Sequence, residues 1–193
     1  MLDWKKNLNV PNLLSFYRLI SFPLVLYFAF VGQEKIFAIL LIINLITDAL
    51  DGLIARGFNL QTEFGAVLDS YADIGMYISA IIGMIIFKAD DLAPHWISFT
   101  VFIVAFIIPK IISYYKFKTF PSLHLYFSKV VGYLQGFFFF VLFAFGFKVT
   151  FYYIVILAGI VSFIEQIIIV ILATEPKSNV KGLYWILTEK DGT

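Results

Sequence analysis

The chain has 193 residues, of which 61% are hydrophobic, 19% aromatic and only 14% charged, and its mean hydropathy is +0.92. This composition is typical of a polytopic membrane protein. The absence of cysteine excludes a disulfide framework and a thiolate site, and a net charge of +1 without a basic patch argues against a nucleic-acid partner.

Six apolar runs each supply the roughly 20 residues that a membrane-spanning helix needs. They cover residues 11–31, 36–56, 64–87, 95–115, 125–147 and 149–173. We therefore predict an all-α fold, a single membrane domain over residues 1–193 with six transmembrane helices. Residues 1–10 are expected to form a short interfacial segment, with a frayed terminus as the alternative. No cleavable signal peptide is expected, because the first apolar run is too long for one.

The first span contains one cation, Arg18, about a third of the way along the run. A charge at this depth either extends its side chain to the membrane interface or faces an anion inside the helix bundle. Both interpretations stay open from the residues alone.

Two pairs of aspartates interrupt the second and third spans. Asp48 and Asp51 are three residues apart, and Asp69 and Asp73 are four apart, so on a helix each pair shares one face. An ionisable group near the bilayer centre costs about 3 kcal/mol, so the four acids need compensation. Carboxylate oxygens are the ligands that hard divalent cations prefer, and four carboxylates suffice for two such ions. The short polar connection between the spans predicts that both pairs lie at one membrane face.

The residues around these acids form a pattern with eight fixed positions. These positions are Asp48, Asp51, Gly52, Ala55, Arg56, Gly65, Asp69 and Asp73. The pattern matches the complete signature of the CDP-alcohol phosphatidyltransferases, and the chain is identified as resembling that family. The first span, with the pattern P-N-x-x-[ST]-x-x-R, resembles bacterial glycerophosphate-type members, except that Ser15 stands where threonine is usual.

The resemblance implies a metal-dependent transfer of a phosphatidyl group from CDP-diacylglycerol to a small polar alcohol, with release of CMP. It implies two divalent cations, Mg²⁺ or Mn²⁺, held by the four aspartates, with Asp73 also acting as the catalytic base. It also implies a homodimer. The residues expected to bind the cytidine diphosphate are Asn12, Asp48, Asp51, Gly52, Ala55, Arg56 and Gly65.

The third connection, which carries Asp90, Asp91 and His95, is expected at the opposite membrane face from the acidic pairs. We interpret it as a solvated turn rather than as a metal site.

The fourth span contains Lys110, and a basic stretch follows this span. Lys110, Lys118 and Lys129 are candidates for binding a phosphorylated acceptor, because they are expected at the same membrane face as the acids. The alternative is that these lysines anchor the chain at the interface. His124 in the same stretch favours neither interpretation.

Glu165 and Gln166 are polar at depth in the sixth span. We expect a structural role, in which they pair with a neighbouring helix or with Arg18.

Basic residues predict the orientation, because eight of those outside the membrane core lie on one side and three on the other. The eight are Lys5, Lys6, Arg56, Lys116, Lys118, Lys177, Lys181 and Lys190, and the three are Lys35, Lys88 and Lys148. Both termini and the acidic pocket should therefore face the cytoplasm, in a bacterial inner membrane.

Three alternatives remain beside transfer to glycerol 3-phosphate. Glycerol 3-phosphate enzymes of the family usually have Pro and Lys where this chain has Ser70 and Ile74, and the D-S-x-A-D form resembles serine-transferring members. Serine, inositol or inositol phosphate is therefore the alternative acceptor. An ion or proton transporter is the alternative from a different functional class, but a transporter has no need for the glycines and Arg56. A catalytically inactive relative is the third alternative, although no signature position is lost.

Overall fold

The computed structural model describes residues 9–118, 125–173, 175, 182 and 183, and these residues contain helices and no strand. The helices are α2 (Val10–Phe30), α3 (Glu34–Gly57), α4 (Glu63–Phe87), α5 (Ala89–Leu92), the 3-10 helix η1 (Ala93–His95), α6 (Trp96–Phe117), α7 (Tyr126–Phe145) and α8 (Val149–Leu172).

Six helical segments of the described chain are long and apolar enough to cross a membrane. The predicted all-α membrane fold with six spans is therefore confirmed, and each predicted span ends within two residues of the corresponding helix. The outward faces of these helices carry large exposed apolar side chains such as Leu13, Ile20 and Leu53, as expected for surfaces that contact lipid. The chain is an integral membrane protein.

The described residues divide into two compact units. The first contains residues 9–92 and 142–146, and the second contains residues 93–118, 125–141, 147–173, 175, 182 and 183. The prediction of a single domain over the whole chain stays a prediction.

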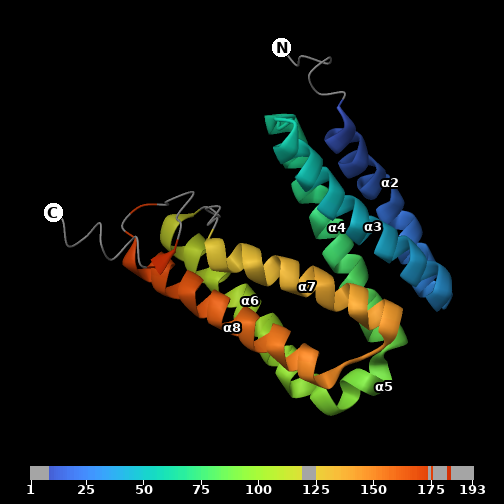
Figure 1. Cartoon of the computed structure of the whole chain (residues 1–193). Helices are drawn as coiled ribbons and strands as arrows, with labels where there is room; N and C mark the ends of the chain where they lie inside the picture. Colours follow the sequence, from blue (N-terminus) through green and yellow to red (C-terminus); the bar gives the residue numbers. More distant parts are fainter. Residues whose placement is uncertain (1–8, 119–124, 174, 176–181, 184–193) are drawn as a thin grey trace. The chain divides into compact units, whose positions relative to one another are not determined.

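In the first unit, α2 packs against both α3 and α4, which also contact each other (Figure 1). Two glycines of α4 make room for aromatic rings on the neighbouring helices. A Cβ atom built on Gly83 would lie 2.1 Å from Cζ of Phe37, and one built on Gly75 would lie 3.0 Å from Cγ of Phe22. Small residues allow helices to approach closely in membranes, where no hydrophobic effect drives them together.

Side-chain caps fix the helix ends near the acidic pairs. Asn9 caps α2 by accepting a hydrogen bond from the backbone N–H of Asn12 at 2.9 Å, and its own amide donates to the carbonyl of Leu60 at 3.1 Å. Asn59 turns the chain after α3 with φ +54°, a conformation that asparagine tolerates. The start of α2 is therefore tied to the connection between α3 and α4.

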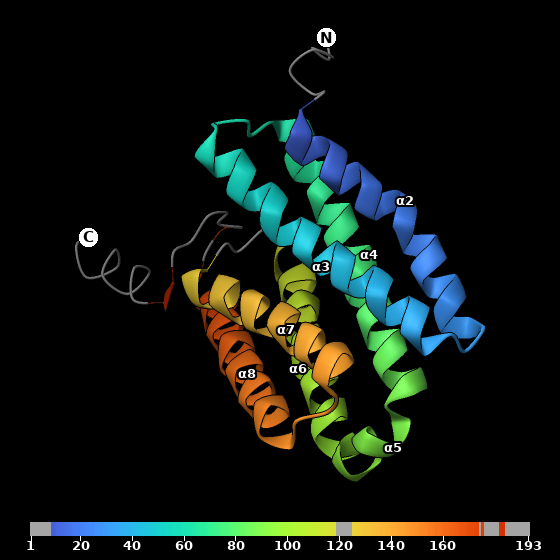
Figure 2. The ribbon, with the colours of Figure 1, turned by 45° about the vertical axis from the view of Figure 1, so that its right-hand side comes forward.

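In the second unit, α6 packs along α8 (Figure 2). Gly159 permits this approach, because a Cβ atom there would lie 2.3 Å from Cε2 of Phe102. Lys116 of α6 donates from Nζ to the carbonyls of Val170 and Ile171, at 3.0 and 2.7 Å. These bonds satisfy carbonyls of the last turn of α8, which lack partners within the helix.

The third connection is helical, whereas the sequence predicts a turn. Residues 89–95 form α5 and η1, in which Asp90 and Asp91 are exposed. His95 makes a 2.9 Å hydrogen bond with the hydroxyl of Tyr153 and stacks on Phe147. Apolar Leu92 is fully buried, and its burial explains why the segment coils instead of looping into solvent.

Candidate active site

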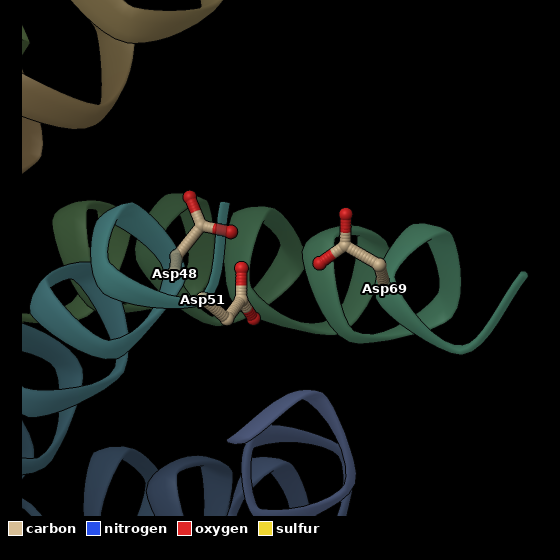
Figure 3. A group of neighbouring side chains, drawn as sticks. All are labelled: Asp48, Asp51 and Asp69. Atoms are coloured by element: carbon tan, nitrogen blue, oxygen red, sulfur yellow. The ribbon is translucent and has the colours of Figure 1, made fainter. Parts of the chain in front are cut away.

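The acidic pairs come together where α3 and α4 face each other. Asp48 and Asp51 lie in the last turns of α3, and Asp69 lies in the first half of α4. One carboxylate oxygen from each lies within 4.8 Å of the other two, and Figure 3 shows the three side chains at neighbouring positions on the two helices. Among the described residues this is the one cluster of three or more acidic or histidine ligands.

Arg18 of α2 joins the fourth acid to this cluster. Its Nη1 donates to Oδ1 of Asp48 at 2.6 Å and to Oδ1 of Asp73 at 2.9 Å. Its Nη2 donates to Oδ2 of Asp51 and to Oδ1 of Asp69, both at 2.5 Å. We call Asp48, Asp51, Asp69 and Asp73 the aspartate box. Of the two interpretations of Arg18, the structure shows the one in which the cation faces anions inside the bundle.

The aspartate box fits the chemistry of divalent cations. An octahedral ion with ligands at about 2.1 Å needs ligand oxygens roughly 3 to 4 Å apart, and the oxygens of Asp48, Asp51 and Asp69 lie within 4.8 Å of one another. These three residues would hold one ion, and a second ion would need Asp73 as well. The guanidinium of Arg18 has the same sign of charge as a metal and contacts the same carboxylates.

Ser15 orients one acid of the box. Its hydroxyl donates to Oδ2 of Asp51 at 3.1 Å and also lies 3.2 Å from the carbonyl of Pro11. Asp51 is the most buried of the four acids, with 6% of its side chain exposed. The family-like pattern of the first span drew attention to Ser15, but nothing in the spacing predicted its contact with α3.

A pocket adjoins the aspartate box within the first unit. Its lining combines the first turns of α2, the last turns of α3, the following connection and the start of α4: Pro11, Asn12, Ser15, Asp51, Gly52, Ala55, Arg56, Leu60, Gln61, Thr62, Gly65, Ala66 and Asp69. Six of the seven residues predicted to bind the cytidine diphosphate are in this lining. The seventh, Asp48, lies in the aspartate box.

Gly65 has a second role that its spacing did not predict. A Cβ atom there would lie 2.1 Å from Oδ1 of Asn12 and 2.9 Å from Oγ1 of Thr62. The hydroxyl of Thr62 caps α4 by accepting from the backbone N–H of Gly65 at 2.9 Å, and it also accepts from Nδ2 of Asn12 at 3.1 Å. Thr62 three residues before Gly65 is an N-cap signal, so the sequence contained a sign of this contact.

Gly52 leaves room for the one guanidinium of the pocket wall. A Cβ atom there would lie 3.3 Å from both terminal nitrogens of Arg56. Arg56 follows Gly52 by one helical turn, so its side chain lies back over the glycine. A planar cation in this position suits bidentate binding of phosphate oxygens.

Comparison with known proteins agrees with this geometry. A family model described as CDP-alcohol phosphatidyltransferase matches residues 8–172. The chain belongs to this family. The predicted membership is confirmed, and the match covers both units of the described structure as well as the signature.

Three relatives carry the name CDP-diacylglycerol–glycerol-3-phosphate 3-phosphatidyltransferase. The relative from Aquifex aeolicus is 37% identical over 87 residues, which cover 45% of this chain and 49% of the relative. The relative from Rickettsia bellii is 34% identical over 42% of this chain and 46% of its own length, and that from Salmonella choleraesuis is 41% identical over 34% and 37%. The chain thus spans half or less of the length of these relatives. No solved structure matches the chain.

The lysines proposed to bind the acceptor lie in the second unit, whereas the aspartate box lies in the first. Nζ of Lys110 donates to the carbonyl of Phe106 at 3.2 Å and lies 3.4 Å from the centre of that residue's ring. Lys118 ends α6 with φ +57°, and Lys129 is exposed on α7. A role for these lysines in binding an acceptor stays a prediction. His124 lies outside the described residues.

Glu165 and Gln166 have structural partners in the second unit. Oε1 of Glu165 accepts from the backbone N–H of Leu183 at 3.1 Å, and Nε2 of Gln166 donates to the hydroxyl of Ser128 on α7 at 3.3 Å. The structure thus shows the predicted pairing with a neighbouring helix for Gln166. Arg18 pairs with the aspartate box instead of with Glu165.

Proposed function

We propose that this chain transfers a phosphatidyl group from CDP-diacylglycerol to the hydroxyl of glycerol 3-phosphate and releases CMP. The observation that carries the proposal is the position of the signature residues. The aspartate box adjoins a pocket lined by Gly52, Ala55, Arg56 and Gly65, so acids suited to metal and a cradle suited to diphosphate meet at one place. Membership of the family supports the same chemistry.

The chain's residues would divide the work as follows. Arg56 would bind phosphate oxygens of the donor, and the small side chains of Gly52 and Gly65 would let the diphosphate approach the helices. Asp73 would accept the proton of the attacking hydroxyl as the new O–P bond forms and the bond from phosphorus to the oxygen of CMP breaks. When bound, two divalent cations, Mg²⁺ or Mn²⁺, would clamp the diphosphate and neutralise charge on the leaving oxygen.

Glycerol 3-phosphate is proposed as the acceptor on two grounds. The names of the three relatives specify it, and it would give the cations Lys110, Lys118 and Lys129 a phosphate to neutralise. Ser70 and Ile74 favour serine or an inositol as the alternative. Transport of ions or protons would use the acids but would not need the adjoining pocket.

The proposed chemistry needs cytidine-activated substrate and metal at the aspartate box. We therefore propose that the box opens to the cytoplasm, with both termini on the same side of a bacterial inner membrane. A homodimer is proposed from the resemblance to the family.

The test is release of CMP from CDP-diacylglycerol by the purified chain. Glycerol 3-phosphate, serine, inositol and inositol phosphate are supplied at equal concentrations with Mg²⁺ or with EDTA. We expect turnover that needs Mg²⁺ and that is fastest with glycerol 3-phosphate. Turnover with serine or inositol alone would contradict the acceptor, and no CMP release with any alcohol would contradict the transferase.

A further inference from the structure

The aspartate box and Arg18 are unbalanced in charge. Four ionised carboxylates and one guanidinium sum to a formal charge of −3, in a helix bundle whose side chains are otherwise largely apolar. Two divalent cations would balance the four carboxylates without Arg18. With Arg18 still in place, the same two ions would leave an excess positive charge. Two divalent ions therefore neutralise the four carboxylates completely and leave no net charge for Arg18 to compensate, whereas Arg18 alone leaves a formal charge of −3.

The contact geometry leads to the same exclusion. The terminal nitrogens of Arg18 lie 2.5 to 2.9 Å from one oxygen of each carboxylate. A divalent cation bonded to one of these oxygens at about 2.1 Å would lie within roughly 5 Å of a guanidinium nitrogen. Like charges at that separation repel each other, and water screens the repulsion little on the side of Arg18, whose side chain is 0% exposed.

Arg18 is also incompletely satisfied where it lies. Its Nε is the one buried side-chain nitrogen or oxygen without a hydrogen-bond partner among the described residues. A buried donor without a partner lowers the stability of the arrangement. The guanidinium thus compensates the carboxylates at some cost to itself, which favours its displacement by ions that compensate them fully.

We propose that Arg18 is an internal counter-cation of the aspartate box and that its ion pairs and divalent cations exclude each other. Arg18 holds the four acids of α3 and α4 together when metal is scarce, and it leaves the box when metal enters. It thereby sets the metal concentration at which the site fills and frees Asp73 as a proton acceptor. The inference rests on the proposed function only in taking the four aspartates as metal ligands.

The test measures metal binding without any substrate. The full chain in detergent micelles is titrated with Mn²⁺ by calorimetry, and its unfolding midpoint is measured in EDTA and in saturating Mn²⁺. We expect Arg18→Gln to bind Mn²⁺ at least about tenfold more tightly than the unaltered chain, a factor typical of coupling between competing ligands. Its unfolding midpoint should be lower in EDTA, and Mn²⁺ should abolish the difference.

Lys88→Gln is the matched control. Lys88 lies in the same unit and forms a 2.7 Å ion pair with Glu34, away from the aspartate box. The substitution removes the same charge and one ion pair, so the affinity for Mn²⁺ should not change. If removal of either cation tightens binding equally, only the net charge matters and the proposal is wrong.

Unchanged or weaker binding of Mn²⁺ by Arg18→Gln would also overturn the proposal. If Arg18→Gln does not fold, Arg18→Lys replaces it, because a single ammonium cannot reproduce the two-nitrogen contact with four carboxylates. It too must bind Mn²⁺ more tightly than the unaltered chain, or the proposal fails. The titration contains neither donor nor acceptor. Its result therefore does not depend on whether the chain releases CMP.

Discussion

Asp73 differs from the other acids of the aspartate box in its neighbours. The oxygens of Asp48, Asp51 and Asp69 form a cluster, whereas Asp73 joins the box through the 2.9 Å contact with Nη1 of Arg18. An acid less engaged with metal is better placed to accept a proton. On this basis we propose Asp73 as the base and the other three acids as the principal metal ligands.

We expect Asp73→Asn to reduce the rate of CMP release at least about a hundredfold, because an amide cannot accept the proton of the acceptor hydroxyl. Binding of CDP-diacylglycerol should remain largely intact. Asp48→Asn should instead weaken the binding of metal and donor together. Steady-state CMP release and a separate donor-binding assay distinguish the two variants. A rate near normal for Asp73→Asn would exclude it as the base.

Gly65→Ala tests the contact between α2 and α4 at the edge of the pocket. The new methyl group would lie 2.1 Å from Oδ1 of Asn12, so Asn12 must move away from Thr62. We expect a loss of about 1 to 3 kcal/mol in the free energy of unfolding, as is usual for overpacking, together with a higher KM for the donor. Chemical unfolding and donor titration measure the two effects.

Gly57→Ala is the control for this substitution. Gly57 is the last residue of α3, and a Cβ atom there meets nothing within 4 Å. Both stability and donor KM should stay near those of the unaltered chain. If the two alanines act alike, the contact between Asn12 and Gly65 is not what makes the glycine necessary.

Sequence spacing located the acids but not their partners. The separations between Asp48 and Asp51 and between Asp69 and Asp73 place each pair on one helix face, because the period of a helix is local. Which anion Arg18 faces depends on how α2 rotates against two other helices, and no local pattern encodes that rotation. The contact of Ser15 with Asp51 escaped prediction for the same reason.

At the scale of helices, the two lysines of α6, Lys110 and Lys116, have different surroundings within the second unit. Lys116 bonds to two carbonyls at the end of α8, whereas Lys110 contacts only its own helix through Phe106 in the interactions described. The sequence groups both as basic residues at one membrane face. The structure assigns a packing role to Lys116, because it satisfies carbonyls that α8 leaves without partners.

Lys116→Met should therefore destabilise the chain by about 1 to 2 kcal/mol, the usual cost of lost hydrogen bonds to a charged group, without raising the KM for glycerol 3-phosphate. Lys110→Met should instead raise the KM for the acceptor, with a smaller effect on the KM for the donor, because it removes binding to a non-reacting phosphate. Thermal unfolding and acceptor titration measure both variants. An unchanged acceptor KM in Lys110→Met would leave Lys110 as an interfacial anchor.

Helix boundaries were predictable because each apolar run has the length of a membrane span and is bounded by polar or turn residues. The exception is the third connection. Its polar residues predict a turn, but burial of Leu92 favours the short helices α5 and η1. One apolar side chain within a polar stretch gives little sign of its burial, so this element was missed.

At the scale of the whole molecule, the sequence predicts the side on which each connection lies from the distribution of its basic residues. Family membership and the six spans are established, whereas the orientation rests on this charge asymmetry alone. The asymmetry predicts that both termini and the aspartate box face the cytoplasm and that Asp91 lies outside. An even number of spans requires the termini to share a side.

Because the chain has no cysteine, single cysteines introduced at chosen positions report the orientation directly. We expect Asp91→Cys, at an exposed site in α5, to react in intact cells with a maleimide that cannot cross the membrane. Cysteines appended at either terminus should react only after the membrane is permeabilised, because both ends are predicted to be cytoplasmic. The unaltered chain serves as the unlabelled control. Labelling of the two termini from opposite sides would mean that an odd number of segments crosses the membrane. Labelling of both termini but not of Asp91→Cys in intact cells would reverse the orientation. The aspartate box would then lie on the side away from the cytidine nucleotides.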